Sequence, residues 1–484
     1  MMEKIAKQVA SSSASLVVRR ISVLATTAVS TAVIARMLDT EDYGQLQASL
    51  AVWAIALTTC EFGFGPVLSR EFTAHAERRP ALLRAGRDLQ GLLGLLGLLG
   101  FVGAGVVVGV HSTQGQIYLA LAPSVAFAAY SGGRSYFLAV FETQRLVRID
   151  VTVALVQCAA VVAVAVTTNS PVLIALTTGV AMAVNTAWVG IAAQRRLGAV
   201  RADRATYRTL TRQVLPLGLS SVISRIYLSI DLVLLGWLAL DSETAYYAGA
   251  VKIVAFLNTL TGLVVSAALP GLSALRDDPE AMLKLAGRLM SWVSVTVLPC
   301  FVITAVFART ACQVLLGDKF EDAAPLVVIL VAAGIVAAAS QVFGALLTAV
   351  DVVKPMLFQN LVGVIINVAG NLVLIPRYGA YASAGFTLLT ELIVCGGSLL
   401  TLSRRFPVGA SLLVTARPLV AVAVAGLTGA LLVDQPWAGI PASLLVLAVM
   451  FRLLHCWPAE LVPQRFRRPS VEPAVLAASE QPRS

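Results

Sequence analysis

Charged residues are scarce in this 484-residue chain, and their scarcity excludes an ordinary soluble domain. Asp, Glu, Lys and Arg together make up 13% of the residues, hydrophobic residues make up 58%, and the mean hydropathy is +0.84. Soluble domains carry about 25% charged and roughly 45–50% apolar residues. Aromatic residues are also few, at 7%. The composition therefore predicts an all-α polytopic membrane protein.

The sequence predicts neither paired cysteines nor a cleavable signal peptide. No two cysteines have a CxxC spacing, and most of them lie inside or at the ends of apolar runs, so we interpret them as small apolar residues. The first ten residues are too polar for a cleavable signal peptide, and the first apolar run is expected to stay as a helix. The six cysteines are Cys60, Cys158, Cys300, Cys312, Cys395 and Cys456.

Long apolar runs dominate what is present. A bilayer core requires about 20 apolar residues per helix, and the breaks between runs are short turn-forming stretches such as "HSTQGQ" and "TTNSP". This criterion predicts about fourteen transmembrane helices. They are expected at roughly 14–36, 45–66, 88–110, 117–140, 150–167, 170–193, 214–239, 244–270, 285–308, 323–349, 356–376, 380–403, 411–433 and 437–456.

The basic residues predict the orientation, because Lys and Arg accumulate on the cytoplasmic side of membrane proteins. With the N-terminus inside, 29 of the 36 Lys and Arg fall in segments assigned to the cytoplasm, and only Arg36, Arg309, Lys319 and Arg377 fall outside. Both termini are therefore expected in the cytoplasm. The net charge of +10 is explained by topology, so no nucleic-acid partner is predicted.

Two acidic turns resemble each other, "ARMLDTEDYGQ" at 35–45 and "LALDSETAYYAG" at 238–249. Each joins the first two helices of a predicted six-helix set, and an even number of helices gives both sets the same orientation, as in a parallel repeat. Helix capping and the helix dipole also favour acids at a helix start, and we expect both explanations to hold. The predicted organisation is an N-terminal lobe (1–205), a C-terminal lobe (206–405), two additional transmembrane helices (406–460) and a disordered cytoplasmic tail (461–484).

A glycine-rich run, "GLLGLLGLLGFVG" at 91–103, repeats Gly at every third position. Dinucleotide-binding loops need different intervals and a preceding strand. The run is instead typical of close packing between transmembrane helices.

Polar side chains recur at helical spacing within several spans, as in Ser15, Arg19, Ser22, Thr26 and Ser30. Ionisable groups inside a bilayer cost several kcal/mol and commonly face a functional cavity, although a single Ser or Thr often bonds only its own helix. Arg225 and Asp231 are also a plausible ion pair. We predict a water-filled cavity between the lobes lined by Arg19, Ser22, Arg225, Asp231, Lys252, Asn367 and Glu391, with Arg20, Glu61, Arg134 and Glu142 near its cytoplasmic mouth.

The side chains predicted to line the cavity indicate which class of solute it would bind. Arg grips phosphate oxygens with two parallel hydrogen bonds and Lys supplies a point charge. A basic chamber with hydroxyl and amide walls suits an anionic solute that is rich in hydroxyl groups. A lipid pyrophosphate that carries sugars has both properties. A hydrophobic cation would instead require aromatic side chains and a dominant carboxylate. No catalytic residue and no metal site is predicted.

Three stretches resemble one known family. The segments "ARMLDTEDYGQ" and "FGFGPVLSRE" are similar to the N-terminal signature of bacterial oligosaccharide flippases, the polysaccharide-transporter family of the multidrug/oligosaccharidyl-lipid/polysaccharide (MOP) exporter superfamily. The segment "IDLVLLGWLALDSETAYYAGAVKI" resembles helices seven and eight of that family, and "NLVLIPRYGAYASAG" resembles its turn between helices 11 and 12. The resemblance covers roughly residues 10–400. The family often has Arg after the Asp of helix seven, where this chain has Leu232.

The resemblance implies a transporter rather than an enzyme. It implies flipping of undecaprenyl-pyrophosphate-linked oligosaccharides across the bacterial cytoplasmic membrane by alternating access, for lipopolysaccharide or exopolysaccharide synthesis. It further implies coupling to a sodium or proton gradient, and Asp231 or Glu391 is our hypothesis for the ion-sensitive group. Polysaccharide polymerase and glycosyltransferases are the expected protein partners.

Other functions are weighed against this one. A cation-coupled drug antiporter of the same superfamily would confer drug resistance and leave surface glycan intact, and a peptidoglycan-precursor flippase is a near neighbour. A membrane glycosyltransferase would use Asp39, Glu41 and Asp42 to hold a divalent cation. However, that connector is short, its echo recurs, and the longest outer loop, 309–322, has only fourteen residues. A purely structural membrane protein would not need polar stripes in both lobes.

Overall fold

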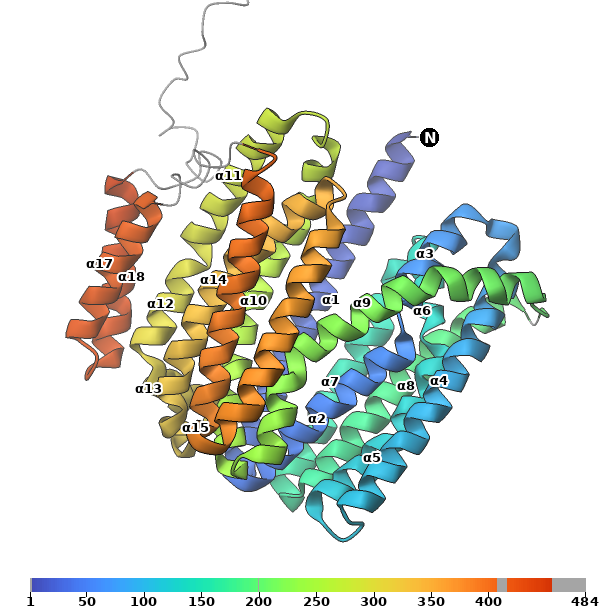
Figure 1. Ribbon diagram of the computed structural model, residues 1–484, viewed down its shortest axis with the longest axis horizontal. Helices are drawn as coiled ribbons and strands as arrows, with labels where there is room; N and C mark the ends of the chain where they lie inside the picture. The colour runs from blue at the N-terminus through green and yellow to red at the C-terminus, as the bar shows by residue number, and fades with distance from the viewer. Residues whose placement is uncertain (1, 199, 407–415, 455–484) are drawn as a thin grey trace, which may run out of the picture.

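The computed structural model describes residues 2–198, 200–406 and 416–454, and every regular element in these ranges is a helix (Figure 1). Helices satisfy all backbone hydrogen bonds within one segment, which is what an apolar chain needs in a bilayer. The elements are α1 (Met2–Met37), α2 (Thr40–Glu61), α3 (Phe64–Ala74), η1 (Ala76–Arg78), α4 (Arg79–Val108), α5 (Thr113–Ala126), η2 (Phe127–Tyr130), α6 (Gly132–Ala139), α7 (Thr143–Thr168), α8 (Pro171–Leu197), α9 (Arg204–Leu238), α10 (Asp241–Ala274), α11 (Pro279–Thr296), α12 (Leu298–Val306), α13 (Ala308–Leu316), η3 (Asp318–Ala323), α14 (Ala324–Ala349), α15 (Val353–Ser403), α17 (Ala416–Leu431) and α18 (Pro436–Leu453).

The chain is a multi-pass membrane protein. Eleven helices within the described ranges are long and apolar enough to cross a bilayer. Three features explain the difference from the fourteen expected spans. The expected span at 117–140 is divided into α5, η2 and α6 after Pro123, α15 contains two expected spans, and α17 falls in the shorter class of apolar helices. Fourteen is therefore an approximate count.

The long helix α15 folds back on itself at Gly379, where φ is +53° and ψ is −134°. Positive φ favours glycine because it has no Cβ. Ser383 donates a hydrogen bond across the fold to Asn371 (3.1 Å), and Gln359 donates one to Thr401 (3.1 Å). The two arms therefore form an antiparallel pair, and Figure 1 shows them side by side.

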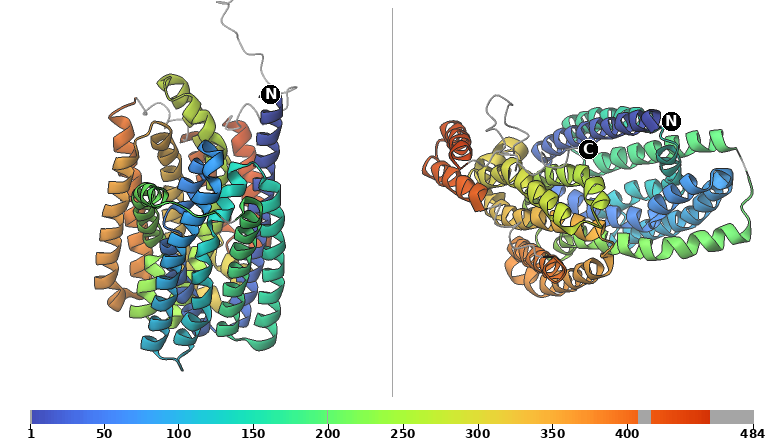
Figure 2. Two further views of the ribbon diagram at one scale, coloured as in Figure 1. Left: turned by 90° about the vertical axis from the view of Figure 1, so that its right-hand side faces the viewer. Right: turned by 90° about the horizontal axis from the view of Figure 1, so that it is seen from above.

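Helices α1–α8 (the N-lobe) and α10–α15 (the C-lobe) lie next to each other. In Figure 1 they diverge toward the end where α1 begins and converge toward the α1–α2 and α9–α10 turns. Figure 2 shows the pair α17 and α18 at the outer edge of the C-lobe, where both helices pack on α12. The first residues of the expected span 411–433, Cys456 and the predicted tail lie outside the described residues.

Helix α9 packs in both lobes. Pro216 lies inside this helix, and an internal proline bends a helix because it removes a hydrogen bond and clashes with the preceding turn. Before Pro216, Leu210 and Val214 belong to a core shared with α3 and α4. After it, Leu234 and Leu235 belong to the large core that includes α10 and α14. Helix α9 thus contributes to the cores on both sides of the predicted boundary at 205/206, which stays a prediction.

The two acidic turns start helices, but not through side-chain capping as expected. Asp39 is the N-cap residue of α2 and its side chain makes no capping hydrogen bond, whereas Asp241 is already inside α10, whose N-cap is Leu240. The expected side-chain caps were therefore wrong for both turns. Asp241 accepts a hydrogen bond from Gln45 at 2.9 Å instead, because the two lobes pack together here. A Cβ at Gly44 would overlap the Asp241 carbonyl oxygen.

Two basic residues join the lobes at the same end. Arg36, at the end of α1, donates to the carbonyl of Val314 in α13, and Lys319 donates to the carbonyls of Arg36 (3.1 Å) and Leu38. The last carbonyls of a helix have no partner within the helix, and cations near them are favourable. Each lobe thus caps a helix of the other. We call these bonds, together with that between Gln45 and Asp241, the closed-end contacts.

Candidate functional site

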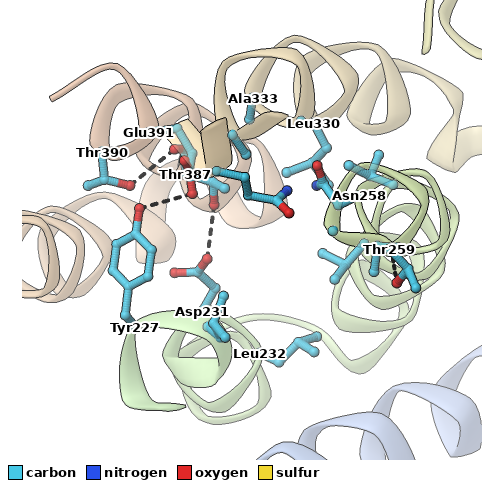
Figure 3. Close-up of a pocket in the computed structure, with 18 of the residues that line it drawn as sticks. Tyr227, Asp231, Leu232, Asn258, Thr259, Leu330, Ala333, Thr387, Thr390 and Glu391 are labelled. Carbon is cyan, nitrogen blue, oxygen red and sulfur yellow. Dashed lines mark hydrogen bonds between the residues drawn. The ribbon is translucent and has the colours of Figure 1, made fainter. Parts of the chain in front are cut away.

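A cavity of about 470 Å³ lies within the C-lobe, between α9, α10, α14 and α15 (Figure 3). Its walls are largely apolar, but two carboxylates, Asp231 and Glu391, face it from α9 and α15. Arg20 of α1 also lines it. The cavity therefore holds charged groups within helices that cross the bilayer.

Asp231 accepts hydrogen bonds from neutral donors on two neighbouring helices. Tyr247 of α10 donates at 2.9 Å, Thr387 at 2.9 Å and Asn371 at 3.0 Å, the last two from the two arms of α15. Asn371 also donates to Asn367 at 3.0 Å. Asn367 and Asn371 are one helical turn apart, so both reach the same side of α15. The hairpin at Gly379 brings Thr387 to the same place.

Glu391 lies one turn beyond Thr387 and accepts a hydrogen bond from Tyr227 at 3.0 Å. Figure 3 shows these groups on the same wall of the cavity, across from Asn258 and Thr259 of α10. Hard cations prefer carboxylate, amide and hydroxyl oxygens as ligands. The Asp231 cluster offers that donor set. No group of three or more His, Cys, Asp or Glu gathers as a metal site among the residues with described placement.

A second cavity, of about 440 Å³, lies in the N-lobe between α3, α6 and α8. Glu61 at the end of α2, Arg134 of α6 and Asn185 of α8 line it, together with hydroxyl groups from Ser69, Tyr130, Ser131, Ser135 and Thr186. Each lobe thus contains its own polar cavity.

An ion-pair network centred on Asp150 borders the N-lobe cavity. Asp150, only 5% exposed, binds both terminal nitrogens of Arg134 at 2.8 Å and pairs with Arg19 Nε at 2.9 Å. Asn185 donates to Asp150 at 3.0 Å and accepts from Arg134 at 3.2 Å. A buried carboxylate held by two arginines and an amide keeps its charge paired within the bilayer. The network joins α1, α6, α7 and α8.

The residues predicted to line one cavity lie in several different places in the structure. Asp231, Asn367 and Glu391 do lie together in the C-lobe cavity. Arg19 instead turns to Asp150 in the N-lobe. Ser22 is half-buried on α1, and its carbonyl accepts a bond from Thr26.

The other two predicted cavity residues are basic and lie elsewhere. Arg225 donates to Thr58 of α2 at 3.2 Å, between the lobes, and the plausible pair with Asp231 does not form. Lys252 is half-buried on α10, outside the linings of both cavities. Whether either side chain contacts a solute stays a prediction.

The residues predicted at the mouth also separate. Glu61 and Arg134 line the N-lobe cavity, whereas Arg20 lines the C-lobe cavity. Glu142 forms an ion pair with Arg196 at the end of α8. Sequence reasoning missed Asp150 and Tyr247. Asp150 stands at the edge of an apolar run, where the same argument about ionisable groups could have found it.

Comparisons with known proteins identify the fold. Residues 112–325 match the family described as "Polysaccharide biosynthesis protein". The lipid II flippase MurJ, in an inward closed conformation, superposes with a TM-score of 0.72 at 13% identity, covering 92% of this chain and 99% of that one. The chain has the MOP-superfamily transporter fold. No curated protein sequence matches the chain.

Two further MOP-superfamily structures show the same arrangement. An outward-facing multidrug resistance MATE transporter gives a TM-score of 0.59 at 14% identity, with 82% of this chain and 96% of that chain covered. A MOP transporter from Pyrococcus furiosus gives 0.51 at 12% identity, with 81% and 92% covered. The resemblance to this superfamily that the sequence predicted is confirmed. By their names the superposed proteins are a flippase and transporters, and this chain shares their fold.

Proposed function

We propose that the chain flips lipid-linked oligosaccharide units, carried on undecaprenyl pyrophosphate, across the bacterial cytoplasmic membrane for surface polysaccharide synthesis. The observation that carries the proposal is a cavity with ionisable side chains in each lobe of a flippase-type fold. The match of residues 112–325 to a polysaccharide biosynthesis family supports the substrate class. Polysaccharide polymerase and glycosyltransferases remain its proposed partners.

Alternating access gives the proposed mechanism. The basic segments assign the N-terminal end of α1 to the cytoplasm, so the closed-end contacts would face outward. In this state the lobes are joined on the outer side, and the sugar headgroup would enter from the cytoplasm. Outward opening requires the bonds from Gln45, Arg36 and Lys319 to break. The lipid tail would remain in the bilayer.

We further propose that a sodium ion or proton couples to this movement at the Asp231 cluster. Asp231 is surrounded by hydroxyl and amide donors that carry no charge. A buried carboxylate without a cationic partner is costly, and a bound cation would neutralise it. Asp231→Asn should therefore abolish the dependence of transport on the ion gradient. An undiminished gradient dependence in this variant would exclude the cluster as the coupling site.

Complementation tests the flippase proposal. Deletion should leave lipid-linked sugar repeats on the cytoplasmic face and remove surface polymer, and the wild-type chain should restore both. Arg225→Ala and Lys252→Ala should fail to restore export at normal protein level. Full rescue by both cationic variants would contradict their proposed contacts with pyrophosphate.

The MATE-like fold keeps a drug antiporter as the second candidate. It predicts drug resistance on overexpression and normal surface glycan in the deletion strain. Accumulation of a peptidoglycan precursor, rather than polymer repeats, would instead indicate a substrate like that of the lipid II flippase. Analysis of the accumulated lipid-linked sugar separates these outcomes.

A further inference from the structure

Two adjacent arginines on α1 serve different lobes. Consecutive residues of an α-helix point about 100° apart, so Arg19 and Arg20 face in different directions. Arg19 pairs with Asp150 of α7, and α1 packs along α7 in the N-lobe. Arg20 lines the C-lobe cavity, and its Nη2 lies 3.4 Å from the point that a Cβ on Gly262 of α10 would occupy. Arg20 thus reaches across the boundary between the lobes.

Apart from this arginine, the described ionisable side chains that line the C-lobe cavity are two carboxyl groups and two tyrosines. Two carboxylates, Asp231 and Glu391, line it, and their hydrogen-bond donors are all neutral. Among the residues whose side chains the structure describes, Arg20 is the one basic residue in the lining of this cavity. It forms no ion pair with any residue whose side chain the structure describes. The positive charge in the described lining therefore comes from the other lobe and is not fixed by a partner.

We propose that Arg20 is a removable counter-charge for the C-lobe cavity. It stays in the cavity while the Asp231 cluster is empty and leaves with α1 when a cation enters, because two positive charges repel in a low-dielectric site. Cation entry is thereby linked to separation of α1 from the C-lobe. The proposal rests on the proposed cation coupling and adds the residue that transmits it.

Linkage makes the proposal measurable without any sugar substrate. If Arg20 and the cation compete, removal of the arginine charge must raise cation affinity. The Na⁺ dissociation constant of the full chain in nanodiscs is measured by isothermal titration calorimetry. Arg20→Gln should bind Na⁺ at least about tenfold more tightly than the wild type, a shift within the usual range of coupling between sites. Arg20→Lys should stay near the wild type because it keeps the charge.

Matched variants separate competition from nonspecific effects. Arg19→Gln removes the same charge one residue away, but on the side of Asp150, and should leave Na⁺ affinity unchanged. Gly262→Ala places a methyl group against Arg20 and against the Gln341 Oε1, 3.2 Å away, and should tighten Na⁺ binding in the same direction as Arg20→Gln. This second variant keeps the test decisive if Arg20→Gln does not fold.

Each result decides the proposal. Tighter Na⁺ binding in Arg20→Gln or Gly262→Ala supports it, including the case in which the wild type binds no measurable Na⁺. Equal or weaker binding in both variants, or no binding in any variant, overturns it. If the wild-type chain fails to restore surface glycan in the deletion strain while Arg20→Gln still binds Na⁺ more tightly, the proposed substrate is refuted and the role of Arg20 stands. If the wild-type chain restores surface glycan but neither variant changes the Na⁺ affinity, the role of Arg20 is refuted and the proposed substrate stands.

Discussion

At the scale of single residues, the charges inside the bilayer are paired differently in the two lobes. In the N-lobe, Asp150 is held by Arg19 and Arg134. In the C-lobe, Asp231 has only neutral donors. A buried ion pair is costly to break by removing one partner, whereas a buried carboxylate without a cationic partner leaves room for a cation. In the described state the N-lobe carboxylate is therefore occupied by two arginines, and the C-lobe carboxylate is the one available to the proposed cation.

Asp150→Asn tests the structural role of the network. Loss of the carboxylate leaves two partly buried arginines without their partner, and breaking a buried ion pair in this way costs about 3–5 kcal/mol. We expect a clearly lower melting temperature in detergent. The double variant Asp150→Asn/Arg134→Gln should be less destabilised than the sum of the single variants. Additive losses would show that the two side chains act independently.

Sequence reasoning found the polar residues of the site but not all of their partners. An ionisable residue in an apolar run is visible in the sequence, which is why Asp231 and Glu391 were identified. Their partners depend on tertiary packing: the hairpin of α15 brings Thr387 to Asp231, and α10 supplies Tyr247. The plausible pair of Arg225 with Asp231 does not form, and Arg225 donates to Thr58 of α2 instead.

At the scale of elements, the glycine run of α4 shows how far a pattern determines packing. A Cβ at Gly94 would come within 3.0 Å of the carbonyl oxygen of Ala126 in α5, and one at Gly97 within 2.7 Å of Val125. A Cβ at Gly100 or Gly103 would meet nothing within 4 Å. Close packing was therefore correctly predicted for part of the run. The pattern cannot tell which glycines face a neighbour and which face lipid.

Single alanine substitutions test this difference. Gly94→Ala forces α4 and α5 apart and should destabilise the chain by about 1–3 kcal/mol, the usual cost of overpacking. Gly100→Ala is the matched control on the same helix. It should be neutral or stabilising by up to about 1 kcal/mol, because alanine favours helix more than glycine does. Thermal unfolding of both variants in the same detergent compares them, and equal melting temperatures would contradict the packing argument.

The helices themselves were easier to predict than their interruptions. Apolar length determines that a span exists, and all fourteen expected ranges have helical counterparts in the described residues. Breaks depend on single residues, such as Pro123 before η2 and Gly379 within α15. Both residue types occur elsewhere in spans without dividing them, as Pro270 does in α10.

At the scale of the whole molecule, the closed-end contacts determine which side of the transporter is sealed. The side chains of Gln45 and Asp241 meet at 2.9 Å across the lobe boundary. Cysteines at both positions should therefore form a disulfide on mild oxidation, with loss of transport that a reductant reverses. Gln45→Cys alone should keep its activity under the same treatment. Failure to crosslink under any condition would contradict the described closed end.

Lys319 should hold this end closed through the carbonyls of Arg36 and Leu38. A hydrogen bond to a charged group contributes about 1.5–3 kcal/mol, so Lys319→Gln should favour the open end roughly tenfold. The rate of disulfide formation between the paired cysteines measures the change and should fall. Arg309→Gln is the control, because Arg309 pairs with Glu321 of its own lobe at 2.8 Å. Adding Arg309→Gln to the protein with the paired cysteines should leave the rate of disulfide formation unchanged.

The course of helix α9 has a consequence for how the protein is made. Its first turns bury Leu210 and Val214 against residues translated long before them. A gene divided between residues 198 and 204 would encode a second fragment whose leading helix lacks the surface it packs on. The second fragment should accumulate when it is co-expressed with the first, and it should be degraded when it is expressed alone.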